Sequence, residues 1–149
     1  MRKKTAGFTL IELLVVLVLG SIMLTLGASG FGDTRSSLAV REARYVFSAM
    51  AARTRAHAIE TGSTAILVAD VRGDSVMIFK NGQLIENVRF SEEMEIDIQG
   101  EAPITRLCMN ARGFADTGCN SFNSTVALGF TNGTRTETIQ ILPLGQILW

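Results

Sequence analysis

The 149-residue sequence has few of the residue types on which most catalytic and metal centres depend. It contains one histidine, so neither a histidine-based zinc centre nor a histidine-driven catalytic relay is expected. Its two cysteines are too few to build a disulfide scaffold. It has no recognisable pairing of a nucleophile with a base and no phosphate-binding loop. We therefore expect a protein that is not an enzyme and that uses no cofactor and no metal.

The sequence is also low in charge and has no excess of either sign. Charged residues make up 19% of the chain, and 14 Lys and Arg balance 14 Asp and Glu. A protein that coats nucleic acid usually carries a basic excess, so nucleic acid is not an expected partner. The 47% of hydrophobic residues excludes a disordered chain, and the length suits one hydrophobic core.

The few charges are unevenly distributed along the first part of the chain. Residues 2–4 are basic, and Glu12 is the only charged residue between positions 5 and 32. The apolar stretch over 8–31 is about 36 Å long as a helix, enough to cross a ~30 Å hydrocarbon core. The preceding basic residues place the N-terminus in the cytoplasm. A cleaved secretory signal is the alternative, but the stretch is long for one and lacks a small-x-small cleavage site.

Glu12 lies within this apolar stretch and needs a partner there. Placing an unpaired carboxylate in lipid costs a free energy of about 3 kcal/mol or more. No basic residue lies within one helical turn of Glu12 on the C-terminal side of Phe8. Cutting the chain after Gly7 would create an amine on Phe8, four residues before Glu12. That amine could pair with Glu12 on the same helix or a neighbouring one.

The residues from Lys3 to Glu12, KKTAGFTLIE, resemble the class III signal of type IV pilins and type II secretion pseudopilins. The resemblance implies that a prepilin peptidase cuts between Gly7 and Phe8 and methylates the new Phe8 amine. It also implies that Glu12 pairs with that amine on an adjacent subunit during assembly. The implied partners are other pilin or pseudopilin subunits, the peptidase, the inner membrane and its assembly platform. Removal of the leader leaves 11 basic and 14 acidic residues, a net charge of about −3.

Helical periodicity predicts a helix from Phe8 to Thr61, about 80 Å long if it is continuous. Three glycines near position 30 mark a weak point, after which Asp33 is a plausible N-cap. Gly62 is expected to end the helix. The second half should pack its apolar positions on the rest of the chain, with the arginines mostly on the other faces. The main apolar positions are Leu38, Val46, Phe47, Met50 and Ile59.

The pattern after Gly62 is typical of strands. They are expected at 65–69, 76–79, 84–90, 94–98, 105–108, 125–130, 136–142 and 146–149. Asn81-Gly82 predicts a hairpin turn. The predicted fold class is α+β, a long N-terminal helix packed on a mainly antiparallel sheet, as in type IV pilins. The expected divisions are the leader 1–7, the membrane and assembly segment 8–32, the amphipathic segment 33–62 and a periplasmic β-rich domain 63–149.

Cys108 and Cys119 are expected to form a disulfide, since the predicted topology puts them in an oxidising compartment. The small loop would stabilise the fold by about 3 kcal/mol in the chain-entropy model. A metal site would need further ligands nearby, and redox chemistry favours a tighter cysteine pair.

Two segments of the body narrow the family. Residues 52–59, ARTRAHAI, and Asn110–Gly113, NARG, are similar to segments of H-type minor pseudopilins and FimT/FimU-type minor pilins. This resemblance implies a minor subunit at the tip or initiation complex of a type II secretion pseudopilus or a type IV pilus. The alternatives are a FimT-like subunit that binds DNA during uptake and a major, filament-forming pilin.

The C-terminal region argues against the DNA-binding alternative. Arg135 is the last basic residue, and residues 142–149 are uncharged, whereas FimT-like pilins that take up DNA use a basic C-terminal region. Arg106, Arg112 and Arg135 are the candidate DNA contacts, but three scattered surface arginines would look the same. Binding to phosphates needs Lys or Arg, so weak or no duplex binding is predicted. The acidic residues 92–97 could hold a divalent cation, although a solvated strand face explains them as well.

Overall fold

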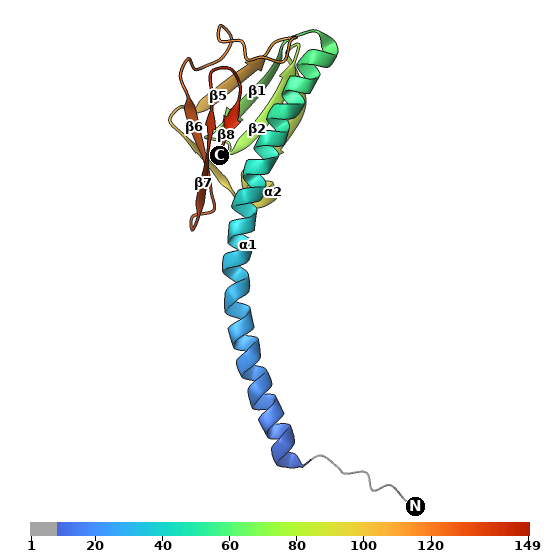
Figure 1. The fold of residues 1–149 in the computed structure, drawn as a ribbon, viewed down its shortest axis with the longest axis vertical. Helices are drawn as coiled ribbons and strands as arrows, with labels where there is room; N and C mark the ends of the chain where they lie inside the picture. Colours follow the sequence, from blue (N-terminus) through green and yellow to red (C-terminus); the bar gives the residue numbers. More distant parts are fainter. Residues whose placement is uncertain (1–8) are drawn as a thin grey trace, which may run out of the picture. The chain divides into compact units, whose positions relative to one another are not determined.

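The computed structural model describes the backbone of residues 9–149 and the side chains of residues 9–24 and 35–149. Its first element is the helix α1, Leu10–Thr61 (Figure 1). The chain divides into two compact units, Met1–Arg35 and Ser36–Trp149. Helix α1 contributes to both, and all strands belong to the second unit.

Helix α1 continues through the glycine-rich segment at residues 27–32. The prediction that Asp33 caps a new helix is therefore wrong, because this residue lies inside α1. Backbone hydrogen bonding by the neighbouring turns outweighs the cost of about 1 kcal/mol for a glycine in a helix interior. The predicted end at Thr61 is confirmed. Gly62 has φ +59°, and the amides of Gly62 and Ser63 donate to the carbonyls of Ile59 and Ala58, which is a Schellman cap.

Eight strands follow, arranged as two antiparallel sheets rather than the single sheet that the sequence suggested. The first sheet has the order β3-β2-β1-β5, and the second has the order β4-β6-β7-β8. The strands are β1 Ala65–Asp70, β2 Ser75–Lys80, β3 Gln83–Arg89, β4 Asp97–Gly100, β5 Ile104–Met109, β6 Val126–Thr131, β7 Thr136–Ile141 and β8 Ile147–Leu148. The predicted hairpin is confirmed: Asn81 and Gly82 both have positive φ and join β2 to β3, with Lys80 paired to Gln83.

The segment between the two sheets differs from the prediction. The expected strand over 94–98 is replaced by a short helix α2, Phe90–Met94, and strand β4 begins only at Asp97. Glu95 ends α2 in the left-handed conformation, at φ 56°. The alternation that suggested a strand therefore spans a helix end, a turn and the start of β4. The acidic residues of this segment do not form one strand face.

The core of the second unit is built around the second half of α1. One stripe of this helix is fully buried, at the near-helical spacing of Val40, Ala43, Phe47 and Met50. The buried rings of Phe90 and Phe130 join it, with centroid distances of 5.7 Å from Phe47 to Phe130 and 5.6 Å from Phe90 to Phe130. Two predicted core positions are wrong: Leu38 is 57% exposed and Ile59 is 52% exposed. Ala51 and Ala58, farther along the helix, are also buried in this core.

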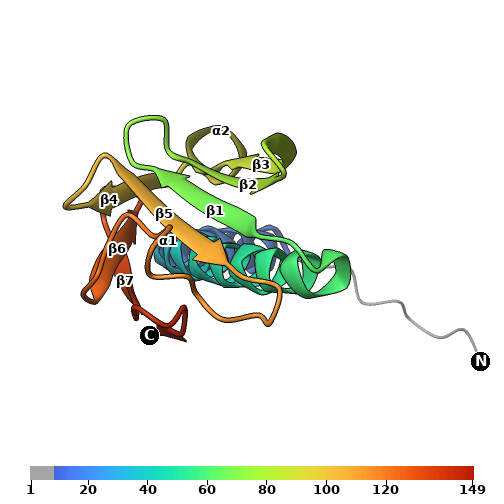
Figure 2. The ribbon, with the colours of Figure 1, turned by 90° about the horizontal axis from the view of Figure 1, so that it is seen from above.

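The second half of α1 contacts both sheets and lies beside them in the view from above (Figure 2). On one side, Arg53 makes an ion pair with Glu86 on β3 of the first sheet. On the other side, Arg44 makes an ion pair with Glu137 on β7 of the second sheet, at 2.9 Å. The helix therefore joins two sheets that share no strand.

Candidate functional site

The first described turn of α1 carries the predicted assembly residue. Thr9 precedes the helix, and its hydroxyl accepts a hydrogen bond from the Glu12 amide at 3.3 Å. The amides of Glu12 and Leu13 also donate to the Thr9 carbonyl, at 3.1 Å and 3.2 Å. A carboxylate here interacts favourably with the positive end of the helix dipole. Glu12 is exposed, and its carboxylate has no ion-pair partner within the described residues.

The large apolar side chains that follow Glu12 are also exposed. They surround the helix on all sides from Leu10 to Leu24, and Leu17, for example, is 65% exposed. A surface of this kind marks contact with other proteins or with lipid. Within the described residues, no helix is both long and apolar enough to cross a membrane. The predicted cleavage and methylation site, Gly7 and Phe8, lies outside the described residues.

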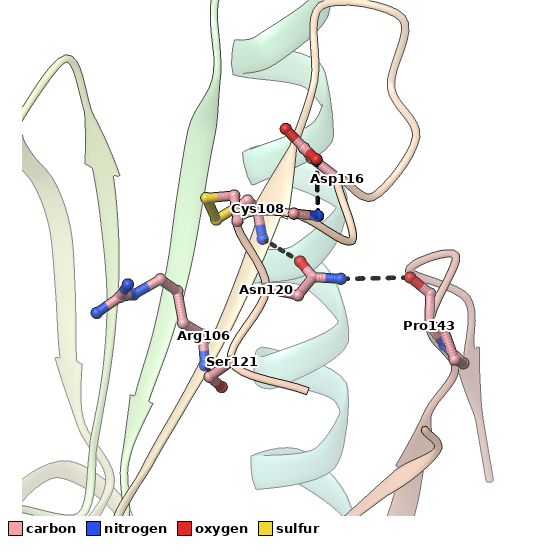
Figure 3. Close-up of a disulfide and its surroundings, with 8 residues drawn as sticks. Arg106, Cys108, Asp116, Asn120, Ser121 and Pro143 are labelled. Atoms are coloured by element: carbon pink, nitrogen blue, oxygen red, sulfur yellow. Dashed lines mark hydrogen bonds between the residues drawn. A yellow bond between two sulfur atoms is a disulfide. The ribbon is translucent and has the colours of Figure 1, made fainter. Parts of the chain in front are cut away.

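The two cysteines lie in the second unit, one on β5 and the other in the loop between β5 and β6. Cys108 on β5 is fully buried and is joined to Cys119 by a disulfide, with 5.8 Å between the Cα atoms (Figure 3). Backbone hydrogen bonds hold both ends of the loop: the Asp116 amide donates to the Cys108 carbonyl, and the Cys119 amide donates to the Asp116 carbonyl. The disulfide therefore closes a loop that already has defined geometry.

Asn120 connects this loop to the C-terminal region. Its Oδ1 accepts a hydrogen bond from the Cys108 amide at 2.9 Å, and its Nδ2 donates to the Pro143 carbonyl at 3.3 Å (Figure 3). Pro143 begins the turn between β7 and β8. The disulfide loop of one sheet and the last turn of the other are thus joined by this amide side chain and by a hydrogen bond from the Ala115 amide to the Leu144 carbonyl, at 3.4 Å.

The three arginines proposed as DNA contacts do not form one patch. Arg106 is exposed on β5, and in Figure 3 its side chain points away from Asn120 and Pro143. Arg112 precedes Gly113, which packs against Ile59 near the end of α1. Arg135 follows Thr134, whose hydroxyl lies 2.8 Å from that of Ser36. Positions 36 and 59 on one helix are about 35 Å apart, so Arg112 and Arg135 lie at opposite ends of the second unit.

The sequence did not predict a group of residues that lies where the C-terminal residues contact α1. It placed the arginines on the outer faces of the helix, but Arg44 and Arg55 are half-buried. Arg55 donates to the Gly145 carbonyl at 3.1 Å, and the Arg44 guanidinium lies 5.1 Å from the centre of the Trp149 ring. Both arginines lie on one helix face, eleven residues apart, which is a detectable spacing. Their contact with residues near position 149 has no local signal.

Comparisons with known proteins agree with the motif and the fold. The family model for the prokaryotic N-terminal methylation motif matches residues 2–28. The crystal structure of the Pseudomonas aeruginosa PAO1 type IV minor pilin FimU in space group P21 is similar, with TM-score 0.52 and 15% identity. The match covers 73% of this chain and 86% of that one. A second crystal form of FimU, in P65, gives TM-score 0.51 and 13% identity over 72% and 90% of the two chains. No curated protein matches the chain significantly in sequence.

These findings agree on the architecture. The chain has the α+β fold of a type IV minor pilin, with a long N-terminal helix and antiparallel sheets, behind a type IV pilin-like methylation motif. At identities of 13–15%, the comparisons bear on the fold alone and do not distinguish an H-type pseudopilin from a FimT-like minor pilin.

Proposed function

We propose that this chain is a minor pilin or pseudopilin, a structural subunit that assembles through the first part of α1 into a type IV pilus or a type II secretion pseudopilus. In this proposal the prepilin peptidase removes residues 1–7 and methylates the Phe8 amine. The methylation motif over residues 2–28 and the minor-pilin fold of the remainder support it.

The main observation in support of the proposal is the environment of Glu12. Its carboxylate stands among exposed apolar side chains and has no cationic partner within the described residues. In a bundle of such helices, water would be excluded and an unpaired carboxylate would be unstable. The Phe8 amine of an adjacent subunit would supply the missing charge. Pairing between subunits would also fix their axial register, which an apolar surface cannot do alone.

The apolar surface around Glu12 supports membrane insertion before assembly. The apolar stretch of the sequence, Phe8–Leu26, continues on both sides beyond the described side chains. With the basic leader in front, it would anchor the subunit in the inner membrane with the second unit in the periplasm. The disulfide suits that oxidising compartment.

The second unit would then carry recognition of specific partners at the tip or initiation complex. A DNA-uptake role receives less support, because Arg112 and Arg135 lie at opposite ends of the second unit and the last residues are uncharged. A major pilin would be distinguished by its abundance in sheared filaments.

Replacing Glu12 tests the proposal. Glu12→Ala should still be inserted and processed, but its incorporation into filaments should fall by about tenfold or more, because the partner amine would be left unpaired. Quantitative immunoblotting of sheared filaments and of membranes measures the two pools. Glu12→Gln tests the charge alone, since glutamine keeps the size of the side chain and its ability to accept hydrogen bonds. We expect it to fail as Glu12→Ala does.

Glu42→Ala is the matched control, because Glu42 is another exposed carboxylate on the same helix. It should assemble normally. Intact mass measured on the membrane pool of each variant should show loss of residues 1–7 and gain of one methyl group. Normal incorporation of both Glu12 variants would refute the pairing, and a wild-type mass that retains the leader would refute the processing site.

A further inference from the structure

The second unit contains a pocket between α1 and the C-terminal residues. Its volume is about 330 Å³, at the lower end of the range for ligand sites. The walls are mainly apolar, formed by Ala51 and Ala52 on the helix and by Ile147 and Trp149 near the C-terminus. Ser48 and Arg55 add polar groups from the helix. A pocket of this size accommodates one or two side chains rather than a folded element.

Arg55 gives the pocket an uncompensated positive charge. One of its terminal nitrogens donates to the Gly145 carbonyl at 3.1 Å, while its Nε is buried and has no hydrogen-bond partner. Arg55 makes no ion pair within the described residues. A half-buried guanidinium is best satisfied by a carboxylate, which accepts two parallel hydrogen bonds from it.

Trp149 forms an exposed aromatic rim beside this charge. Its side chain is 64% exposed, yet it is held in place by the Tyr45 ring at 5.6 Å and the Arg44 guanidinium at 5.1 Å. Tryptophan, tyrosine and arginine are the residues that most often dominate binding energy at protein interfaces. Contacts that hold a side chain in its binding position lower the entropic cost of binding.

The charges around the pocket favour a single carboxylate over a nucleic-acid strand. Arg44 is already paired with Glu137 at 2.9 Å, and Arg41 lies 3.9 Å from the same carboxylate. A phosphodiester backbone needs several free cations in a row. Arg55 alone supplies one unpaired cation next to an apolar wall.

We propose that this pocket binds a peptide segment of a partner protein that presents a carboxylate beside an aliphatic side chain. The carboxylate would accept hydrogen bonds from Arg55, and the aliphatic group would pack against Ala52, Ile147 and Trp149. This binding activity goes beyond filament assembly and does not depend on it, because every residue involved lies in the second unit.

The fluorescence of Trp149, the only tryptophan in the chain, can test the proposal directly. The probes are the peptide acetyl-Gly-Leu-Leu with a free carboxylate and the same peptide with an amidated C-terminus. The full chain is titrated in a nonionic detergent. We expect the acid to bind at least about tenfold more tightly than the amide, the gain typical of hydrogen bonds to a charged group. Equal affinity, or no binding of either peptide, would overturn the proposal.

Two variants locate the site, and one serves as a control. Arg55→Met should abolish the preference for the acid, whereas Arg106→Met, which removes an exposed arginine on β5, should keep it. Because Arg55 also holds Gly145, Ala52→Leu is included: it fills the pocket without touching that hydrogen bond, and both peptides should then bind at least about tenfold more weakly. Retained binding in Ala52→Leu would refute the location. Tighter, Arg55-dependent binding of a thymidine oligonucleotide than of the acid would identify a nucleic-acid site instead.

Discussion

The two halves of helix α1 differ in what surrounds their apolar side chains. In the first unit, the large apolar residues from Leu10 to Leu24 are exposed on all sides. In the second unit, Val40, Phe47 and Met50 are almost completely buried, and the other faces carry charged residues and alanines with only a few exposed large apolar side chains such as Leu38 and Ile59. Hydrophobicity alone does not decide burial within the chain. A helix that is apolar all round needs lipid or other helices around it, whereas an amphipathic helix is covered by its own domain.

The largest expected effect comes from truncating one large apolar side chain to alanine in each half of α1, which tests this contrast. Phe47→Ala should destabilise the second unit by about 3–5 kcal/mol, because it leaves a cavity beside Phe130. Leu17→Ala removes a similarly large side chain from an exposed position and should change the same unfolding by less than about 0.5 kcal/mol. Denaturant unfolding of the full chain in detergent, followed by Trp149 fluorescence, measures both. A comparable loss in both variants would show that the two halves unfold together.

Reduction of the disulfide should have the next largest effect and should be confined to the second unit. Breaking the bond between Cys108 and Cys119, separated by 11 positions, should lower stability by about 3 kcal/mol in the chain-entropy model. The helix content of the first unit, which contains no cysteine, should not change. Circular dichroism and unfolding curves with and without reductant test this. Two reactive thiols in the unreduced, denatured protein would mean that the disulfide is absent.

The smallest expected effect is a change of sign between a glycine inside the helix and the glycine that ends it. Gly62→Ala should destabilise the second unit by about 1 kcal/mol, because alanine is strained at φ +59° although the space beside it is open. Gly20→Ala, also in open space but inside the helix, should instead raise helix stability in the first unit by about 1 kcal/mol. Unfolding midpoints and helix content distinguish the two. Stabilisation by Gly62→Ala would contradict the left-handed cap.

Much of the fold could be predicted because its signals are local. The Thr61-Gly62 helix end, the Asn81-Gly82 hairpin and most strand positions depend on the conformational preferences of neighbouring residues. The prediction failed over 94–98, where an alternating pattern covers a helix, a left-handed Glu95 and the start of β4. It also failed for Leu38 and Ile59, because helical spacing cannot tell which stripe of an alanine-rich helix the sheets will cover. The division into two sheets depends on pairings between distant strands.

The sequence by itself determined the features that depend on residue type and short spacing. These are the basic residues 2–4, the Gly7-Phe8 pair, Glu12 in an apolar stretch, and the α+β class. Only the tertiary structure decided that Arg55 meets Gly145, 90 positions away, and that Arg44 lies between Glu137 and Trp149. It also placed Arg112 and Arg135 far apart. The physical reason is that local preferences fix helices and turns, whereas pockets and charge patches arise where packing brings together segments with no relation along the chain.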